Sequence, residues 1–176
     1  MNETLYYLPI IERVIPYAQE LDGTCGPASL VTIYRSWGER IDEQTLIGEI
    51  QPDLGMIDSK YFGGTTHQQM EDNARLHGYN VLTTYNVPYI DLIFLTKQKG
   101  WPVIVEWMSD VDGEVESDCH YSVIVDADED KVRMADPSYG EWKTLDKDTF
   151  KKKWYGFERD GSQSEHFAMI IWKKGV

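Results

Sequence analysis

The sequence predicts an α+β fold, in which helices come first and an antiparallel sheet follows. Before Trp101, apolar side chains recur every three to four positions between helix start and stop signals. After Trp101 the pattern changes to short β-prone runs that are separated by turn signals. Helices and strands segregated in this way are typical of the α+β class. The 176 residues have ordinary apolar and charged fractions and no linker, so residues 1–176 are expected to form one domain.

The N-terminal segment, residues 1–18, is rich in apolar side chains and has prolines at two positions, which predicts an extended lead-in ending as a strand near Gln19. The first helix is predicted to begin at Cys25. The glycine that follows permits a tight entry, and Pro27 suits the first turn, where its missing N–H costs nothing. Gly38 provides the stop. The apolar face of this helix consists of Leu30, Ile33, Tyr34 and Trp37.

Two more helices are predicted from their capping residues. Asp42 can cap a short helix that ends at Ile50, and residues 51–64 are expected to form a loop. A capping box then marks the next helix, with Thr66 as the N-cap and Gln69 three residues later.

That helix is expected to end at Gly78, and residues 79–84 have the composition of a strand. A fourth helix is predicted to start near Pro88, with Asn86 as its cap, and to end before Gly100.

The second half of the chain is predicted to consist mainly of strands. Residues 101–108 place alternate apolar side chains on one face, and Asp112-Gly113 is a hairpin signal. Further strands are expected at 120–127, 131–135, 141–145 and 166–172. A short helix is predicted before the last strand. Asp146 is its cap, Phe150 and Trp154 form its apolar face, and Gly156 is expected to end it.

Charge and composition exclude several classes of function. A net charge of −13 argues against nucleic acid or an anionic membrane as a partner. No apolar run reaches the length of a membrane span and no signal peptide is recognisable at Met1, so a cytoplasmic protein is expected. Cys25 and Cys119 are too few for a disulfide framework, and no further ligands with zinc spacing accompany them. The acidic residues between Asp110 and Asp118 lack the twelve-residue pattern of a calcium loop. No metal or cofactor is therefore expected.

Cys25 is the candidate nucleophile. At a helix N-terminus the macrodipole favours the negative thiolate over the thiol. A cysteine taken alone is more often an inert apolar residue. Here the Gly-Pro helix entry and the glutamine six positions earlier favour a catalytic interpretation.

Of the four histidines, His120 is the best candidate for a base, because it opens a strongly β-prone run. The strand is predicted to turn and return so that Asp136 follows its partner. A three-residue loop at 127–129 would place His120 directly opposite Asp136, whereas a two-residue loop would put them on opposite faces. In the first register the carboxylate fixes the tautomer of the ring, and the other ring nitrogen is free for Cys25.

Gln19 is the candidate oxyanion donor. Its side-chain amide, together with a backbone N–H at the start of the Cys25 helix, would stabilise the negative oxygen of a tetrahedral intermediate. Nucleophile, base, orienting acid and oxyanion donor are the parts that acyl transfer requires.

These residues resemble the C39-like branch of the papain-like cysteine peptidases. The resemblance lies in Gln19 with Cys25-Gly26-Pro27-Ala28-Ser29-Leu30, in His120-Tyr121-Ser122-Val123-Ile124-Val125 and in Asp136-Pro137. It extends over residues 14–172. It implies a papain-like fold, with an N-terminal helical layer packed on a C-terminal antiparallel sheet. It also implies Cys25 as nucleophile, His120 as base and acid, Asp136 as orienter and Gln19 in the oxyanion hole.

The resemblance implies a hydrolase that cleaves a peptide or related amide and needs no cofactor, with a peptide or protein substrate as partner. The best-known members of the family cut leader peptides after a double glycine while joined to an export transporter, of which no segment is recognisable here. Two alternatives stay open: an acyltransferase or transpeptidase that uses the same triad, and a non-catalytic domain that binds peptides. The sequence leaves the substrate and the oligomeric state open.

Overall fold

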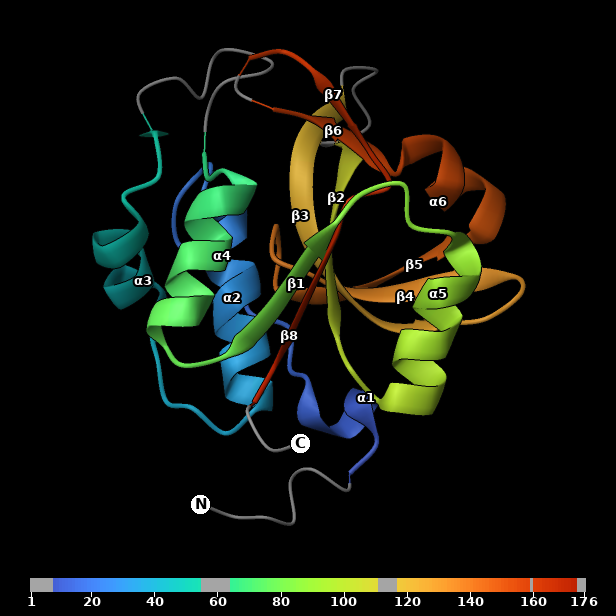
Figure 1. Cartoon of the computed structure of the whole chain (residues 1–176), viewed down its shortest axis with the longest axis horizontal. Coiled ribbons are helices and arrows are strands. Elements are labelled where there is room, and N and C mark those ends of the chain that lie inside the picture. The colour runs from blue at the N-terminus through green and yellow to red at the C-terminus, as the bar shows by residue number, and fades with distance from the viewer. Residues whose placement is uncertain (1–7, 55–63, 111–116, 159, 174–176) are drawn as a thin grey trace.

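The computed structural model describes residues 8–54, 64–110, 117–158 and 160–173. The helices are α1 (Ile10–Arg13), α2 (Cys25–Ser36), α3 (Glu43–Ile50), α4 (His67–Leu76), α5 (Tyr89–Ile93), the π-helix η3 (Phe94–Lys99) and α6 (Lys147–Lys153). The strands are β1 (Asn80–Thr84), β2 (Val103–Asp110), β3 (Ser117–Ala127), β4 (Lys131–Asp136), β5 (Glu141–Asp146), β6 (Tyr155–Phe157), β7 (Gln163–Glu165) and β8 (Ala168–Trp172). The predicted α+β class is confirmed (Figure 1).

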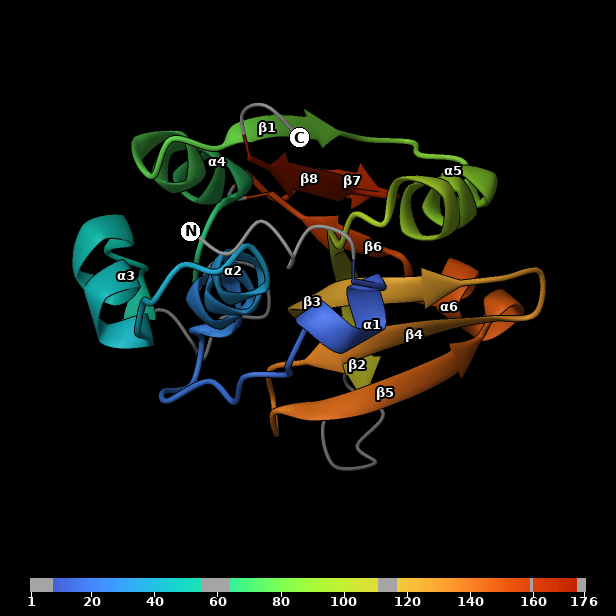
Figure 2. The same cartoon turned by 90° about the horizontal axis from the view of Figure 1, so that it is seen from below.

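A six-stranded antiparallel sheet organises the molecule, with strand order β1-β8-β2-β3-β4-β5, and β6 pairs with β7 in a separate hairpin. Helices α2, α3 and α4 gather on one side of the sheet, and α5 and α6 lie on the other (Figure 2). The two faces accordingly carry two hydrophobic cores, one around α2 and one under α5 and α6. Among the described residues, no helix has the length and apolar character that a membrane span needs.

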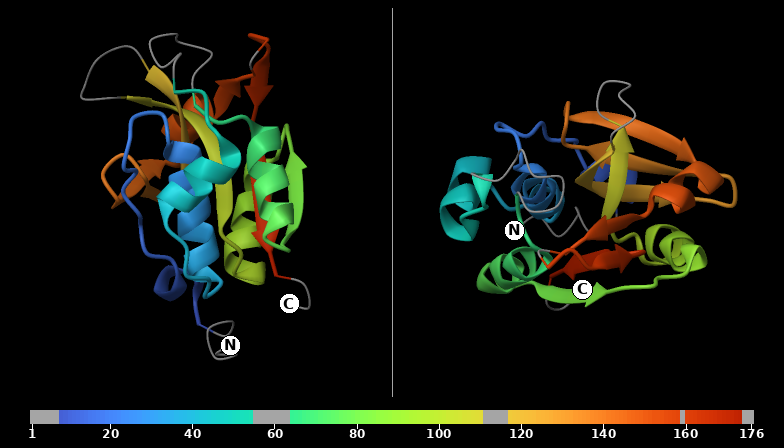
Figure 3. Two further views of the ribbon diagram at one scale, coloured as in Figure 1. Left: turned by 90° about the vertical axis from the view of Figure 1, so that its left-hand side faces the viewer. Right: turned by 90° about the horizontal axis from the view of Figure 1, so that it is seen from above.

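Helix α2 is the central element of the first core and matches its prediction. Its four predicted apolar residues are at most 2% exposed, and the Trp37 Nε1 donates a hydrogen bond of 3.0 Å to the carbonyl of Ile171 on β8. Gly38 has a φ of 81°, which ends the helix in a conformation that glycine adopts without strain. Figure 3 shows α2 side by side with α3 and α4 in one layer.

The predicted caps of α3 and α4 are confirmed. The Asp42 carboxylate accepts a hydrogen bond of 2.8 Å from the Thr45 N–H. At α4, Thr66 and Gln69 form the full capping box, with each side chain bonded to the other residue's backbone. These caps satisfy N–H groups that have no partner within the helix.

The predicted N-terminal strand is wrong. Where residues 8–18 are described, they contain the single-turn helix α1, with Pro9 as its N-cap, and no strand. In the described part of the chain, the large sheet consists of β1 to β5 and β8, so residues 8–18 contribute no strand to it. The predicted hairpin signal Asp112-Gly113 and most of the predicted loop at 51–64 lie outside the described residues.

Other boundaries need correction as well. Asn86 does not cap α5: it has a φ of 56° and its N–H donates to the Glu165 carbonyl, while Pro88 takes the cap position. Helix α6 ends at Lys153, and Gly156 belongs to β6 instead of stopping the helix. A Cβ at position 156 would lie 1.9 Å from the Glu106 carboxylate, so close packing explains this glycine. The β6–β7 hairpin has no counterpart among the predicted elements.

The β3–β4 hairpin does not have the predicted three-residue loop. The Asp128 N–H donates a 3.0 Å hydrogen bond to the Lys131 carbonyl, which leaves a two-residue turn between them. The Asp128 carboxylate reinforces this turn by accepting hydrogen bonds of 2.9 Å from the N–H groups of Asp130 and Lys131. Such side-chain bonds are how an aspartate fixes a tight turn.

A β-bulge compensates for the shorter turn. Between Ile124 and Asp126 the register with β4 shifts by one residue. This extra residue returns His120 and Asp136 to the same face, which a two-residue turn alone would not allow. Continuing the register along β4 places Ser138 opposite His120, so Asp136 is its diagonal neighbour. The predicted face is therefore right, and the predicted register is wrong.

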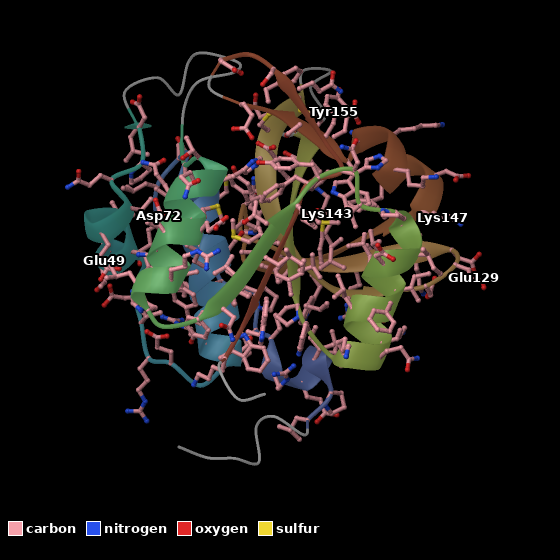
Figure 4. The ribbon with its side chains drawn as sticks, viewed as in Figure 1. Glu49, Asp72, Glu129, Lys143, Lys147 and Tyr155 are labelled. Atoms are coloured by element: carbon pink, nitrogen blue, oxygen red, sulfur yellow. The ribbon has the colours of Figure 1, made fainter. Side chains whose placement is uncertain are left out.

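A polar cluster joins the three helices of the first layer. His77, which follows α4, places its Nδ1 2.7 Å from Glu39 and its Nε2 2.9 Å from Glu49. Figure 4 labels Glu49 on α3. The Tyr79 hydroxyl donates to the same Glu39 at 2.7 Å, and the Tyr34 ring stacks on His77 at 5.0 Å. Burial lowers the pKa of His77, but hydrogen bonds to Glu49 and Glu39 outweigh it and raise the pKa above the ordinary value.

We expect His77→Gln to destabilise the protein by about 1–2 kcal/mol at pH 6, because hydrogen bonds from the charged ring to two carboxylates are lost. A raised folded pKa stabilises most below the unfolded pKa of about 6.5, and the contribution fades as pH rises through the folded value. Urea unfolding at pH 6 and pH 9 measures the difference. An equal loss at both pH values would contradict a charged His77.

Candidate active site

Cys25 is the first residue of α2 and is half-buried. The cap residue Thr24 makes no side-chain cap bond to the helix, so the first backbone N–H groups are not capped by it. Gly26 packs so closely that a Cβ there would lie 2.9 Å from Thr65. The helix start thus holds a thiol among backbone donors, and the neighbouring glycine lets the segment before α4 approach it.

His120 and Asp136 form a buried pair. The ring Nε2 lies 2.7 Å from the Asp136 Oδ1, and the two residues are 7% and 5% exposed. The Ser138 N–H donates to the same carboxylate oxygen at 3.0 Å, and its hydroxyl lies 3.2 Å from His120 Nε2. Because Asp136 engages Nε2, Nδ1 is the nitrogen left for another partner.

That partner is Cys25. Its side chain lies near enough to His120 to raise the pKa of the ring, and Asp136 raises it as well. Burial lowers the pKa of His120, but hydrogen bonds to Asp136 and Cys25 outweigh it and raise the pKa to about 9. Burial likewise raises the pKa of Asp136, yet the hydrogen bond from His120 outweighs it and the pKa falls to about 2. Both shifts favour a charged ring beside an ionised carboxyl group.

Two residues that the sequence analysis did not assign to the site complete the surroundings of this pair. The Trp107 ring lies edge-on to His120, with centroids 6.1 Å apart, and donates from Nε1 to the Ser122 hydroxyl at 3.0 Å. Lys143 on β5 places its Nζ 3.5 Å from Asp136 Oδ2 and 4.8 Å from the centre of the Trp107 ring. The lysine cation helps to keep Asp136 ionised.

Gln19 lies beside the segment that follows Asp136. Its backbone N–H donates to the Pro137 carbonyl at 2.8 Å, and its side-chain Nε2 donates to the Leu21 carbonyl at 3.0 Å. The side-chain Oε1 is buried and has no hydrogen-bond partner among the described residues. These contacts place Gln19 between the loop before Cys25 and the loop after Asp136.

Cys119 has a different environment from Cys25, although it precedes His120 directly. It is half-buried on β3, and its thiol donates to the Met108 sulfur at 3.6 Å. Burial, and then the charge of Glu106, raise the pKa of Cys119 to about 12. This cysteine is therefore a neutral thiol at physiological pH. In the described part of the chain, no three His, Cys, Asp or Glu side chains are grouped so that they could hold a metal ion.

A second buried polar cluster lies near the site and was missed from the sequence. His67, the first residue of α4, places Nε2 3.1 Å from Glu106 on β2 and Nδ1 2.8 Å from Glu158. The Ser164 hydroxyl donates to Glu106 at 2.7 Å, and the Phe167 ring stacks on His67 at 3.6 Å. The cluster fastens the β6–β7 hairpin to the start of α4. Its members are far apart in the sequence, so no local pattern could have revealed it.

Comparison with known proteins supports the same fold. The family model described as Peptidase_C39 like family matches residues 11–162 of this chain. A search of curated proteins finds no match.

Several solved structures are similar. The peptidase domain of Streptococcus ComA, a bifunctional ABC transporter, has a TM-score of 0.68 at 17% identity, over 92% of this chain and 99% of that domain. A double-glycine-motif protease from an AMS/PCAT transporter, in complex with the leader peptide, has a TM-score of 0.64 at 15% identity, over 90% of each chain. A C39-like peptidase from Bacillus anthracis has a TM-score of 0.61 at 18% identity, over 93% of this chain and 98% of that one. At these identities the likeness shows the fold.

The two cysteines give a direct test of the site's electrostatics. We expect iodoacetamide to alkylate Cys25 at least about 100-fold faster than Cys119 at pH 7, because only the thiolate reacts and Cys119 is held neutral. Mass spectrometry of tryptic peptides over a time course measures both rates. Equal, slow alkylation of the two residues would show that the helix start and His120 do not activate the sulfur.

Proposed function

Because this chain belongs to the Peptidase_C39-like family, we propose that it is a cysteine peptidase that cleaves a peptide or related amide bond through a thioester on Cys25. The observation that supports the proposal is the buried His120, whose Nε2 lies 2.7 Å from Asp136 Oδ1 and whose pKa is raised by both Asp136 and Cys25. Chains of sulfur, imidazole and carboxylate in this order activate a nucleophile and transfer its proton.

In the proposed mechanism His120 accepts the thiol proton of Cys25 at Nδ1 as the sulfur attacks. The sulfur attacks the carbonyl carbon of the substrate, so a C–S bond forms and the carbonyl oxygen becomes an oxyanion. When the C–N bond breaks, His120 donates its Nδ1 proton to the leaving amine and a thioester remains. His120 then takes a proton from water as the oxygen of that water attacks the thioester, which releases a carboxylic acid and restores Cys25.

Asp136 and Gln19 have supporting roles in this mechanism. Asp136 accepts the Nε2 hydrogen throughout, which keeps Nδ1 directed at the sulfur and stabilises the charged ring. Gln19 Nε2 uses one of its two hydrogens for the Leu21 carbonyl and retains the other for the oxyanion. A backbone N–H at the start of α2 is the second donor, as in oxyanion holes generally.

A peptide is the substrate class that this proposal favours. Exposed apolar side chains lie on both loops of the site: Leu21, two residues after Gln19, is 45% exposed, and Tyr139, next to Ser138, is 66% exposed. Apolar surface at the edge of a polar site suits the side chains of a peptide. The structural relative described as a complex with a leader peptide shows that this fold can bind a peptide in that protein.

The proposal is tested with a peptide library and mass spectrometry of the products. We expect cleavage that disappears with Cys25→Ala and persists with Cys119→Ala, which is the matched control. Asp136→Asn should lower kcat by about 10²–10⁴-fold, because the amide no longer fixes the charged ring. Candidate amines in parallel reactions reveal acyl transfer as amide products.

Loss of cleavage in Cys119→Ala, or cleavage that survives Cys25→Ala, would contradict the assignment of the nucleophile. Circular dichroism of each variant establishes that the fold is retained. A domain that only binds peptides would bind the peptide in the unmodified protein and in all three variants, and none of the four would release a product.

A further inference from the structure

The orientation of the Gln19 side chain depends on a single carbonyl group. Its Nε2 donates to the Leu21 carbonyl at 3.0 Å. If the amide were turned over, Oε1 would face that carbonyl, and two acceptors would meet without a proton between them. The Leu21 carbonyl therefore determines which end of the amide carries the hydrogens that an oxyanion needs.

The Leu21 carbonyl is itself held by Thr24, the residue before Cys25. The Thr24 hydroxyl donates to it at 2.7 Å, and the Leu21 N–H approaches the same hydroxyl oxygen at 3.4 Å. Thr24 is fully buried. A buried hydroxyl with one proton has a fixed direction of donation, so the residues between Gln19 and Cys25 form a closed, oriented loop.

A buried carboxyl group lies beneath this loop. Glu43, the first residue of α3, is 0% exposed, and its Oε2 accepts a hydrogen bond of 2.8 Å from the Glu20 N–H. Its Oε1 is buried and has no hydrogen bond of normal geometry to any residue that the structure describes. A carboxylate oxygen without a donor is costly in such a place, whereas a protonated one can donate.

Thr24 is the group that such a proton would reach. Burial raises the pKa of Glu43, and the nearby Thr24 side chain lowers it by a smaller amount. A neutral Glu43 can donate from Oε1 to the Thr24 hydroxyl oxygen, while that hydroxyl donates onward to the Leu21 carbonyl. Every hydrogen bond in the series then has one donor and one acceptor.

We propose that Glu43 and Thr24 are positioning residues for the oxyanion hole, holding the loop of residues 19–24 so that the Gln19 amide presents a hydrogen to the substrate oxygen. Neither residue touches the reacting atoms, and both act through the Leu21 carbonyl. The inference rests on the proposed function, because Gln19 has this duty only if a tetrahedral intermediate forms on Cys25.

Two probes that need no natural substrate distinguish a change in the oxyanion hole from a change in the reactivity of the thiol. Acetyl-glycinal adds to the Cys25 sulfur to form a hemithioacetal, in which the former carbonyl oxygen occupies the oxyanion position. Iodoacetamide alkylates the same sulfur by displacing iodide and forms no oxyanion. The affinity of the aldehyde is measured as protection of Cys25 against iodoacetamide.

We expect Glu43→Met and Thr24→Val to weaken aldehyde binding by about 10-fold, a part of the 10²–10³-fold effect of losing an oxyanion donor outright. The conservative variants Glu43→Gln and Thr24→Ser keep a donor at the same position and should restore binding to within about 3-fold of the original protein. Gln44→Ala is the matched control. Gln44 lies next to Glu43 on α3 and donates to the Glu20 carboxylate at 2.7 Å, but this contact is exposed. Alkylation of Cys25 by iodoacetamide should change by less than about 3-fold in all five variants.

A double-mutant cycle distinguishes positioning from general stability. In a Gln19→Ala background, Glu43→Met should cause no further loss of aldehyde affinity, because the residue through which it acts is gone. If Glu43→Met does not fold by circular dichroism, Thr24→Val takes its place in the cycle.

Additive losses in the cycle would overturn the inference, and so would unchanged aldehyde affinity in Glu43→Met and Thr24→Val beside a clear loss in Gln19→Ala. Both results leave the proposed peptidase intact. If Cys25 proves no more reactive than Cys119 and binds no aldehyde, the proposed function itself fails, and the inference fails with it.

Discussion

The hydrogen bond between His120 and Asp136 requires that both side chains lie on the same face of the β3–β4 hairpin. Side chains alternate between the two faces of a strand, so the turn and any bulge together must let both residues share a face. The two-residue turn at Asp128–Lys131 would break this condition, and the bulge between Ile124 and Asp126 restores it. The contact between His120 and Asp136 is thus a consequence of where one extra residue lies in β3.

This constraint also explains the limits of prediction from the sequence. The sequence permitted a common face for His120 and Asp136 but did not require it, because a two-residue loop without a bulge would have separated their faces. The register could not be predicted, because a three-residue loop and a two-residue turn with a bulge both place these residues on one face. In the structure the Asp128 carboxylate fixes the two-residue turn by accepting from the N–H groups of Asp130 and Lys131.

Sequence signals predicted the structure correctly where the two interacting residues lie close together in the sequence. The caps at Asp42 and Thr66 and the start of α2 at Cys25 involve residues within a few positions of each other, and all three are confirmed. The family and the α+β fold could be predicted from motif order. Signals failed where the partner is distant: Gly156 looked like a helix stop, but it is small because the Glu106 carboxylate needs its space.

The polar cluster around Glu106 is the clearest case of structure beyond the reach of sequence patterns. His67 lies 39 positions from Glu106 and 91 from Glu158, yet its ring contacts the buried carboxyl group of the first and the partly exposed one of the second. Tyr121, opposite Glu106 in the β2–β3 ladder, donates to the Thr65 carbonyl at 3.0 Å. Buried polar groups that are bonded to one another favour one arrangement over the alternatives. Thr65 in turn packs closely against Gly26, the residue after Cys25.

The central claim is that His120 carries its positive charge because it lies between Asp136 and the Cys25 sulfur. The most direct measurement is a pH titration of the ¹⁵N-labelled imidazoles by NMR, in the intact protein and in Cys25→Ala, with His120→Gln assigning the signal. The account predicts a pKa of about 9 for His120 in the intact protein and a lower one without the sulfur. A His120 that titrates near 6.5 in both proteins would contradict the account, because its ring would then be paired with neither group.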